Sequence, residues 1–285
     1  MKTLSSEREI ELTLKEAPIR KRNKFNFRFQ ELYEYLNQFK YNNHQILLSI
    51  ILPAYNEEQT IKQILESLPK DDSIEIIVID DNSTDNSVIE VKKANNNRKI
   101  KLIKHKQNRG YGGAIITGIK QAKGVVIVTM DSDGQHCPQD LLKIVKPIFE
   151  GEADCTLGSR YLGRSYYNLP IKTRLGEAII EKILQIGFGQ KIMNNQNGFR
   201  AFNRQLVPFY VKAKYHGFTY ATEMLIITLA NRYKIKECPV KVYEREHGVS
   251  KINLIKLILN LLTCFVRYYF KKFKVNIKNR TLHLI

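Results

Sequence analysis

The feature that most constrains the fold of this chain is a fourfold alternation of apolar runs with segments of helical spacing. The apolar runs cover residues 47–55, 74–81, 99–105 and 124–133. After each of the first three runs, apolar residues recur at steps of three and four, as in TIKQILESL. Strands and helices that alternate over short connections are typical of a parallel sheet flanked by helices. The sequence therefore predicts a doubly wound, Rossmann-like α/β fold.

The second half of the chain is less regular. The spacing of apolar residues predicts one helix around 174–186, a second near 222–232 and a strand over 234–244. Ahead of the sheet, Phe29, Leu32, Leu36 and Phe39 stand at helical spacing within an extension that covers residues 1–45. We expect one helix there that packs on the main body, with binding to a partner as the alternative.

Three of the four apolar runs end in polar clusters. These clusters are Tyr55-Asn56-Glu57, Asp80-Asp81 and Asp131-Ser132-Asp133. In doubly wound sheets, ligands bind beyond the carboxyl ends of the strands. We therefore expect the three clusters to meet in one crevice.

Asp131 and Asp133 stand two residues apart, so alternation in a strand directs both carboxylates to the same side. Gln135 adds an amide oxygen two residues further on. Hard oxygen ligands without sulfur or imidazole suit Mg²⁺ or Mn²⁺, with diphosphate oxygens completing the shell. A turn or a helix start is the alternative, but the position directly after GVVIVTM favours the metal.

An acidic pair and a glycine-rich segment each allow more than one interpretation. Asp80 and Asp81 either cap a turn or helix or accept hydrogen bonds from a nucleobase or ribose. The segment RGYGGAIITG lacks the spacing of a dinucleotide-binding loop and the acidic residue that should follow it. We expect it to form a closely packed backbone loop near the donor.

Four basic residues in short polar stretches follow the acidic pair. They are Arg160, Arg200, Arg245 and Lys251. Any one of them could be a solvated charge. Four of them after a metal site suggest phosphate clamps, because a guanidinium group binds phosphate through two parallel hydrogen bonds.

The formal net charge of +18 calls for an anionic partner. The last 45 residues hold 10 Lys and Arg against 2 acidic residues, so the excess is concentrated beside the most apolar segment. This favours a membrane surface over nucleic acid, as does the absence of tryptophan and of an RNA-binding aromatic signature.

The start MKTLSSEREIEL has acids where a signal peptide needs an apolar run, so we expect a cytoplasmic protein. The four cysteines are scattered, and we expect reduced, structural thiols.

Residues 252–285 form an apolar and basic C-terminal segment. Its polar residues recur at steps of three or four, which would place them in a single stripe along one helix. They are Asn253, Lys256, Asn260, Thr263, Arg267 and Lys271. That stripe disfavours a membrane-spanning helix, which needs about 20 mainly apolar residues. It favours an amphipathic helix on anionic head groups, and a helix that merely covers the domain core is the alternative.

Six ordered motifs now carry a resemblance that spans roughly residues 46–255. They are LPAYNEE, IDDNSTDNS, MDSDGQH, GSRY, GFRAF and HGVSK. In this order they resemble the family 2 glycosyltransferases of GT-A fold and, more narrowly, the dolichyl- or polyprenyl-phosphate mannose or glucose synthases. The resemblance implies a catalytic domain over residues 46–251, followed by the membrane-proximal segment.

The resemblance also implies roles for individual residues. Nucleotide contacts fall to Pro53, Tyr55, Glu57, Val78 and Asp80. Asp131, Ser132, Asp133 and Gln135 would form the metal and diphosphate site, and Arg160, Arg200, Arg245 and Lys251 would bind the phosphate of the donor or the lipid. Of these, Asp131, Asp133 and Arg160 are the predicted catalytic residues.

Two positions depart from the pattern of the family. Asn82 replaces a frequent glycine, which we expect to be harmless because asparagine tolerates a left-handed backbone. Asn194 stands where relatives often carry an acid, which would weaken or redirect the activity if that acid sets the geometry of the acceptor or the sugar.

Together these features predict a metal-dependent, inverting transfer of a hexose to a lipid phosphate. The donor would be GDP-mannose or UDP-glucose, and the enzyme would lie on the cytoplasmic face of a membrane. The nearest alternative is a family 2 transferase with a sugar acceptor in cell-surface glycan assembly. A nucleotidyl- or phosphotransferase that uses the same crevice and a non-catalytic scaffold are further alternatives.

Overall fold

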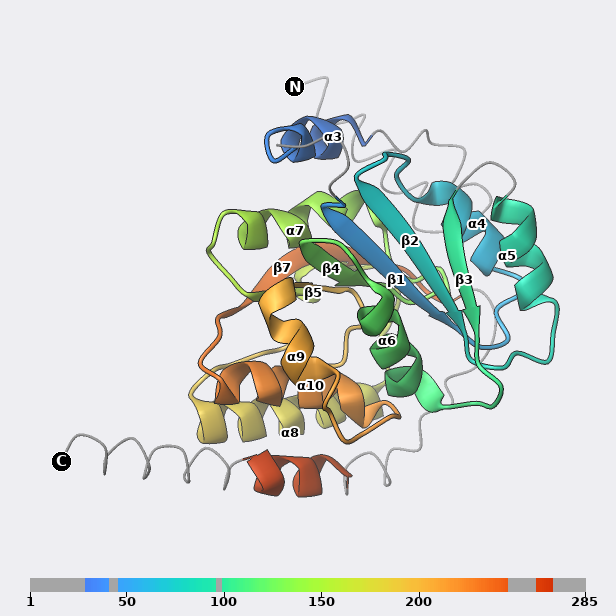
Figure 1. Ribbon diagram of the computed structural model, residues 1–285. Coiled ribbons are helices and arrows are strands. Elements are labelled where there is room, and N and C mark those ends of the chain that lie inside the picture. The colour runs from blue at the N-terminus through green and yellow to red at the C-terminus, as the bar shows by residue number, and fades with distance from the viewer. Residues whose placement is uncertain (1–28, 41–45, 96–98, 246–259, 269–285) are drawn as a thin grey trace, which may run out of the picture.

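A seven-stranded sheet forms the centre of the computed structural model, which describes residues 29–40, 46–95, 99–245 and 260–268 (Figure 1). The strand order is β3-β2-β1-β4-β6-β5-β7. The strands are β1 (Leu48–Ala54), β2 (Ile74–Asp80), β3 (Ile100–Lys104), β4 (Val126–Thr129), β5 (Cys155–Ser165), β6 (Arg200–Asn203) and β7 (Ile235–Val242). Strands β1 to β4 pair in parallel, β6 is antiparallel to both of its neighbours, and β5 and β7 are parallel. The predicted mostly parallel α/β sheet is therefore confirmed.

Two layers of helices cover the two faces of the sheet. The helices are α3 (Gln30–Asn37), α4 (Ile61–Ser67), α5 (Ser87–Asn95), α6 (Gly110–Gln121), α7 (Leu141–Phe149), α8 (Ile171–Phe188), α9 (Val207–Tyr210) and α10 (Thr219–Ala230), with 3₁₀ turns at Pro138–Asp140 and Arg204–Leu206. Helices α3, α4, α5 and α7 share one hydrophobic core with Ile50 of β1. Helices α6, α8, α9 and α10 share the other core with Ile51. Successive residues of β1 thus face opposite layers, which explains why the strand is a continuous apolar run.

The glycine-rich segment differs from its prediction as a loop. Helix α6 begins at Gly110, so these glycines form its first turns. A Cβ on Gly112 would lie 2.5 Å from Cβ of Tyr220 in α10, and a Cβ on Gly118 would lie 2.4 Å from Ile51 in β1. Glycine at these positions therefore lets α6 pack closely against a helix on one side and the sheet on the other.

Helix α3 packs on the outer layer next to α7. Leu32 and Leu36 are buried, and the ring centroids of Phe39 and Phe149 are 4.8 Å apart. The apolar residues whose spacing predicts this helix are thus the ones that contact the main body. The boundaries of the domains themselves stay a prediction.

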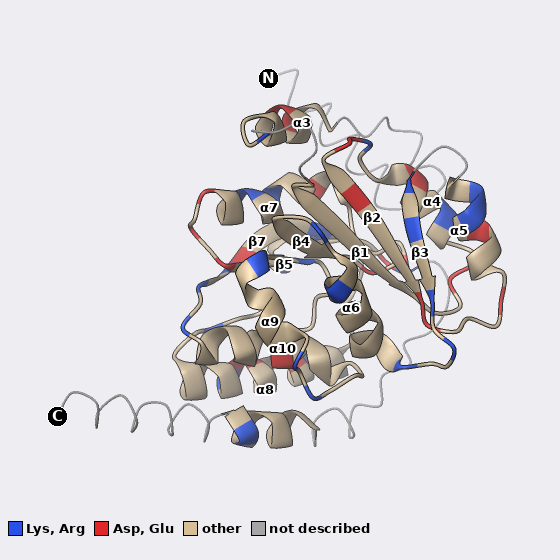
Figure 2. Ribbon diagram, viewed as in Figure 1, with Lys and Arg blue, Asp and Glu red and all other residues tan. Residues whose placement is uncertain are grey.

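The described part of the C-terminal segment, residues 260–268, is helical and lies on the same side of the sheet as α8 and α10 (Figure 1). Its Leu261 and Cys264 are buried. Figure 2 shows α10 almost free of charge apart from Glu223, whose Oε1 accepts a hydrogen bond of 2.7 Å from Tyr268 Oη. This part of the segment therefore covers the core, and the rest of residues 252–285 lies outside the described residues.

Within the described ranges, none of the helices combines the length and the apolar character that a membrane crossing requires. The four cysteines, at positions 137, 155, 238 and 264, are free and buried, in agreement with the expectation of reduced thiols.

Candidate active site

The loops that follow β1 and β2 are hydrogen-bonded to each other. Asn56 donates its backbone N–H to Ser83 Oγ at 3.0 Å, and Asn56 Oδ1 accepts from the Thr84 N–H at 2.8 Å. Asn56 and Asn82 both have a left-handed backbone, with φ of 59° and 65°. Asn82 thus adopts the conformation that was expected of it in place of glycine.

The loop after β4 is tied to β1 in the same way. Ser132 Oγ donates to the Pro53 carbonyl at 2.7 Å, and Thr60 Oγ1 donates to the Ser132 carbonyl at 2.7 Å. Tyr55 is half-buried in the loop between them, whereas Val78 is fully buried in the hydrophobic core. The structure therefore brings the ends of β1, β2 and β4 together, as the sequence predicts.

Asp131 stands directly beyond β4, and its two carboxylate oxygens differ. Oδ2 lies 3.1 Å from Nε2 of His136. Oδ1 is buried and has no hydrogen-bond partner among the described residues. A Cβ on Gly198 would lie 2.2 Å from Oδ1 and 2.3 Å from Oδ2, so a glycine at 198 is what makes room for this carboxylate.

The pKa of Asp131 lies below its ordinary value of 3.8. Burial raises this pKa. Its effect is outweighed by the hydrogen bond and the charge of His136, by a hydrogen bond from the Tyr111 hydroxyl and by the charge of Arg245, which all lower the pKa. Asp131 is therefore an anion at neutral pH.

Asp133 is buried and forms an ion pair with Arg245. Nε of Arg245 donates to Asp133 Oδ2 at 3.0 Å, and a second, shorter bond joins the same oxygen to Nη2. Asp133 Oδ1 accepts from the backbone N–H of Gln135 at 3.0 Å. The Gln135 side chain donates through Nε2 to the Tyr243 carbonyl at 3.1 Å.

Glu57 completes this acidic group from the end of β1. Burial and the charge of Asp133 raise the pKa of Glu57 from 4.5 to about 7, although Arg245 and a hydrogen bond from Thr60 oppose the shift. Three carboxyl groups and one guanidinium group thus influence each other at the junction of β1 and β4.

The two acids after β2 have different surroundings. Asp81 caps the first turn of α6, because its carboxylate accepts from the backbone N–H groups of Arg109 and Gly110 at 2.8 Å each. Asp80 is 1% exposed and accepts long bonds of 3.3 and 3.4 Å from the Ser83 N–H. The capping interpretation therefore describes Asp81, while a nucleotide contact of Asp80 stays a prediction.

Arg160 is held by a network that crosses the second half of the chain. Its Nε and Nη2 donate to Asn194 Oδ1 at 3.1 and 2.8 Å, and Nη2 also donates to Glu177 Oε1 at 2.8 Å. Nη1 donates to the Tyr167 hydroxyl. Asn194 is fully buried, so its neutral amide oxygen receives Arg160 at the position where the resemblance suggests an acid.

Among the described residues, Arg200 is hydrogen-bonded to backbone carbonyls and not to the acidic group. Its side chain is 1% exposed, and its nitrogens donate to the carbonyls of Asn197, Asn195 and Ala221. Burial and three backbone partners favour a structural role, so its contact with phosphate stays a prediction. Lys251 lies outside the described residues.

Asp131, Asp133 and Gln135 offer the hard oxygen donors that Mg²⁺ and Mn²⁺ prefer. The buried, unpartnered Oδ1 of Asp131 fits a cation, while Arg245 holds Asp133 Oδ2 in this structure. Among the described residues no group of three or more His, Cys, Asp or Glu is arranged to hold a metal. In the site that the sequence predicts, diphosphate oxygens would complete the shell of the cation.

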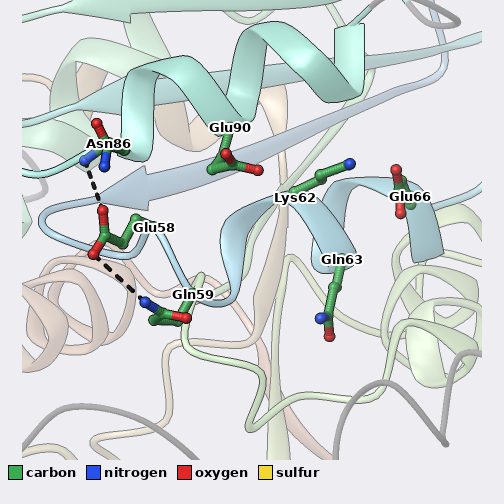
Figure 3. Close-up of a pocket in the computed structure, with 7 residues that line it drawn as sticks. All are labelled: Glu58, Gln59, Lys62, Gln63, Glu66, Asn86 and Glu90. Atoms are coloured by element: carbon green, nitrogen blue, oxygen red, sulfur yellow. Dashed lines mark hydrogen bonds between the residues drawn. The ribbon is translucent and has the colours of Figure 1, made fainter.

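A cavity of about 630 Å³ lies elsewhere, between α4 and α5 (Figure 3). It is lined by Glu58, Gln59, Lys62, Gln63, Glu66, Asn86 and Glu90. The acidic pair and Arg160 do not line it, and three of its seven lining residues are acidic, which is unsuited to an anionic donor. We therefore place the site at the strand ends.

Sequence reasoning missed four residues that shape this site: Tyr111, His136, Glu177 and Gly198. His136 follows the acidic pair within MDSDGQH and could have been found from that motif. The other three act through contacts between distant parts of the chain, which no local signal indicates.

The fold and this group of acids beside arginines define an α/β enzyme of the GT-A class. A family model described as glycosyl transferase family 2 matches residues 49–209, more than half of the chain. The chain belongs to this family and is a glycosyltransferase.

Similar proteins support this membership. The UDP-N-acetylglucosamine--dolichyl-phosphate N-acetylglucosaminyltransferase of Methanococcus voltae is 33% identical over 225 residues, covering 72% of this chain and 89% of the relative. A dolichol-phosphate mannosyltransferase of Pyrococcus furiosus is 30% identical, with 72% of this chain and 59% of the relative covered. Both names contain the dolichyl or dolichol phosphate of the narrower group that the six motifs resemble, and the P. furiosus name also contains its mannose.

Among solved structures, glucosyl-3-phosphoglycerate synthase from Mycobacterium tuberculosis in complex with Mn²⁺, UDP-glucose and phosphoglyceric acid has the same fold. Its TM-score is 0.62 at 22% identity, with 77% of this chain and 79% of that chain covered. At this identity the likeness speaks for the fold alone.

Proposed function

We propose that this chain transfers a hexose from a nucleotide-sugar to a polyprenyl or dolichyl phosphate, with Mg²⁺ or Mn²⁺ and with inversion at the anomeric carbon. The observation that carries the proposal is the meeting of three strand ends at Asp131 and Asp133, beside Arg245. Two relatives are named for transfer to dolichyl or dolichol phosphate.

The donor would lie over the strand ends. Pro53, Tyr55, Glu57 and Asp80 border the nucleotide in this proposal, and Asp131, Asp133 and Gln135 hold the cation. Bound there, the cation would neutralise the nucleoside diphosphate as it leaves. Arg245 would then move from Asp133 to donor phosphate, because guanidinium groups bind phosphate as well as carboxylate in a bidentate manner.

The acceptor would approach Arg160. A phosphate monoester is already an anion near neutral pH, so it needs to be positioned and does not need a general base. Glu177 and Asn194 fix the guanidinium group from the protein side. Attack from the face opposite the leaving diphosphate would invert the anomeric centre. The enzyme would work on the cytoplasmic face of a membrane, as a peripheral protein.

A screen of donors against two kinds of acceptor tests the proposal. GDP-mannose, UDP-glucose and UDP-N-acetylglucosamine, the last because of the M. voltae relative, are each offered with a short polyprenyl phosphate or with a free oligosaccharide. We expect labelled sugar on the lipid phosphate, with the opposite anomeric configuration to the donor by NMR. Transfer to the oligosaccharide alone would support the glycan-assembly alternative, and transfer of a nucleotide or phosphate would contradict the proposal altogether.

A further inference from the structure

Helix α8 carries large apolar side chains on its outer face. Ile171 is 83% exposed, Leu175 62%, Ile179 40% and Ile186 84%. Their spacing of four, four and seven residues places them in one row along the helix. We call these four residues the α8 stripe.

The inner face of the same helix reaches the predicted acceptor site. Ile180 and Leu184 are buried in the core below α8, and the buried Glu177 accepts hydrogen bonds from Arg160 at 2.8 Å and Tyr161 Oη at 2.6 Å. One rigid helix therefore presents apolar side chains outward and holds the predicted phosphate-binding arginine inward.

Cations accompany the stripe. Arg174 and Lys182 are exposed on α8, at one edge of the stripe and within it respectively. The helix of residues 260–268 packs beside α8, where Phe188 of α8 meets Phe265 edge-on with ring centroids 6.0 Å apart. Leu262 and Val266 of that helix are 46% and 52% exposed.

We propose that the α8 stripe is a membrane-docking surface that lays the catalytic domain on a lipid bilayer with anionic head groups. The inference rests on the proposed function, since a lipid-phosphate acceptor is presented at such a surface. Apolar side chains would enter the head-group boundary while Arg174 and Lys182 remain at the phosphates. Arg160 would thereby be brought to the level of the acceptor phosphate.

The charge of the surface favours a bilayer over a second copy of the chain. A second copy of a chain with net charge +18 would be repelled, whereas anionic lipid would be attracted.

Flotation of the full-length protein with vesicles tests the docking surface. The vesicles are phosphatidylcholine with or without phosphatidylglycerol, and neither donor nor acceptor is added. We expect the Ile171→Gln/Leu175→Gln double variant to bind at least about tenfold more weakly than the unaltered protein. Arg174→Gln/Lys182→Gln should weaken binding only to vesicles with phosphatidylglycerol. The matched control is Ile89→Gln, whose side chain is 50% exposed on α5 in the opposite helix layer.

Wild-type binding by the double variant, or no binding by the unaltered protein, would overturn the inference. A loss of self-association in the double variant, seen by sedimentation at equal concentration, would assign the stripe to a second copy instead. Circular dichroism and thermal melting check that the variants fold.

Activity separates this inference from the proposed function. With a short, water-soluble polyprenyl phosphate and no vesicles, the double variant should keep the wild-type turnover, and it should lose turnover when a long-chain acceptor is embedded in vesicles. Absence of transfer to any lipid phosphate, together with the expected flotation, would refute the proposed function and leave the docking surface standing.

Discussion

The two halves of the sheet hold their polar residues in different ways. In the half from β1 to β4, polar side chains at the strand ends bond to nearby loops, as Asn56 does to Ser83 and Ser132 to Pro53. In the half from β5 to β7, charged side chains lie inside the protein and bond across helices, as Arg160 does to Glu177 and Arg200 to Ala221. The first half thus gathers its polar groups at the strand ends, whereas the second holds two arginines inside the protein through individual side-chain contacts.

This difference teaches where a substitution should affect chemistry and where it should affect folding. A backbone framework survives the loss of one side chain at its edge. A buried polar network does not, because each lost partner leaves another polar group without a hydrogen bond.

The largest expected effect is on activity in the first half. Asp133→Asn should lower kcat by about 10³-fold or more, because the site loses one of the two carboxylates that would hold the cation and, through it, the diphosphate. The fold should survive, since Arg245, the ion-pair partner, is one-third exposed and can be solvated. Turnover is measured with saturating Mg²⁺ or Mn²⁺, and folding by circular dichroism. Near-normal transfer by the variant would refute the metal assignment.

The second half should show the reverse pattern. Arg200→Met should lower the free energy of unfolding by about 3 kcal/mol, because three carbonyls lose a buried, charged donor. Urea unfolding followed by circular dichroism measures this loss.

The matched control is Arg204→Met. Arg204 also donates to two carbonyls, those of Gly124 and Ala122, but it is exposed, so water can replace it. We expect a loss of about 1 kcal/mol there. Equal losses at both positions would show that burial of Arg200 adds nothing, and the contrast between the two halves would fail.

The same contrast explains what could be predicted from the sequence. Strands β1 to β4 and helices α4 to α6 follow from periodicity, because strands buried on both faces are uninterrupted apolar runs. Helix α7 was missed since Pro147 stands inside it, and proline normally ends a helix. Strand β6 has only four residues and begins with a buried arginine, and the second part of β5 is exposed. Neither has an apolar run to reveal it.

The residues of the site likewise fall into those that could be predicted from the sequence and those that could not. The acids at the strand ends could be placed because their position depends on the strand that precedes them. The burial of Arg200, the capping by Asp81 rather than Asp80, and the role of Glu177 could not, because each depends on a contact with a distant segment.

Gly198 sharpens the comparison, since it is a residue of the second half that shapes a carboxylate of the first. Gly198→Ala would place a Cβ within 2.2–2.5 Å of the Asp131 carboxylate, which must therefore move. We expect the affinity for Mn²⁺ to fall about tenfold, as measured by calorimetry with UDP or GDP present. The control is Gly217→Ala, where a Cβ would meet nothing within 4 Å. Unchanged affinity in Gly198→Ala would show that Asp131 does not bind the cation.

The smallest expected effect is a pH dependence within the first half. Burial and Asp133 raise the pKa of Glu57 to about 7, against 4.5 in the unfolded chain. As pH rises from about 4.5 to 7, the unfolded chain ionises this group while the folded chain keeps its proton, so the free energy of unfolding falls. Glu57→Gln lacks this fall and should gain about 1 kcal/mol over wild type between pH 5 and pH 8, less than full burial would give because Glu57 is only half-buried. Urea unfolding of both proteins without metal measures the difference. Parallel curves would mean that Glu57 is already ionised at pH 5, and would contradict a pKa of Glu57 raised to about 7.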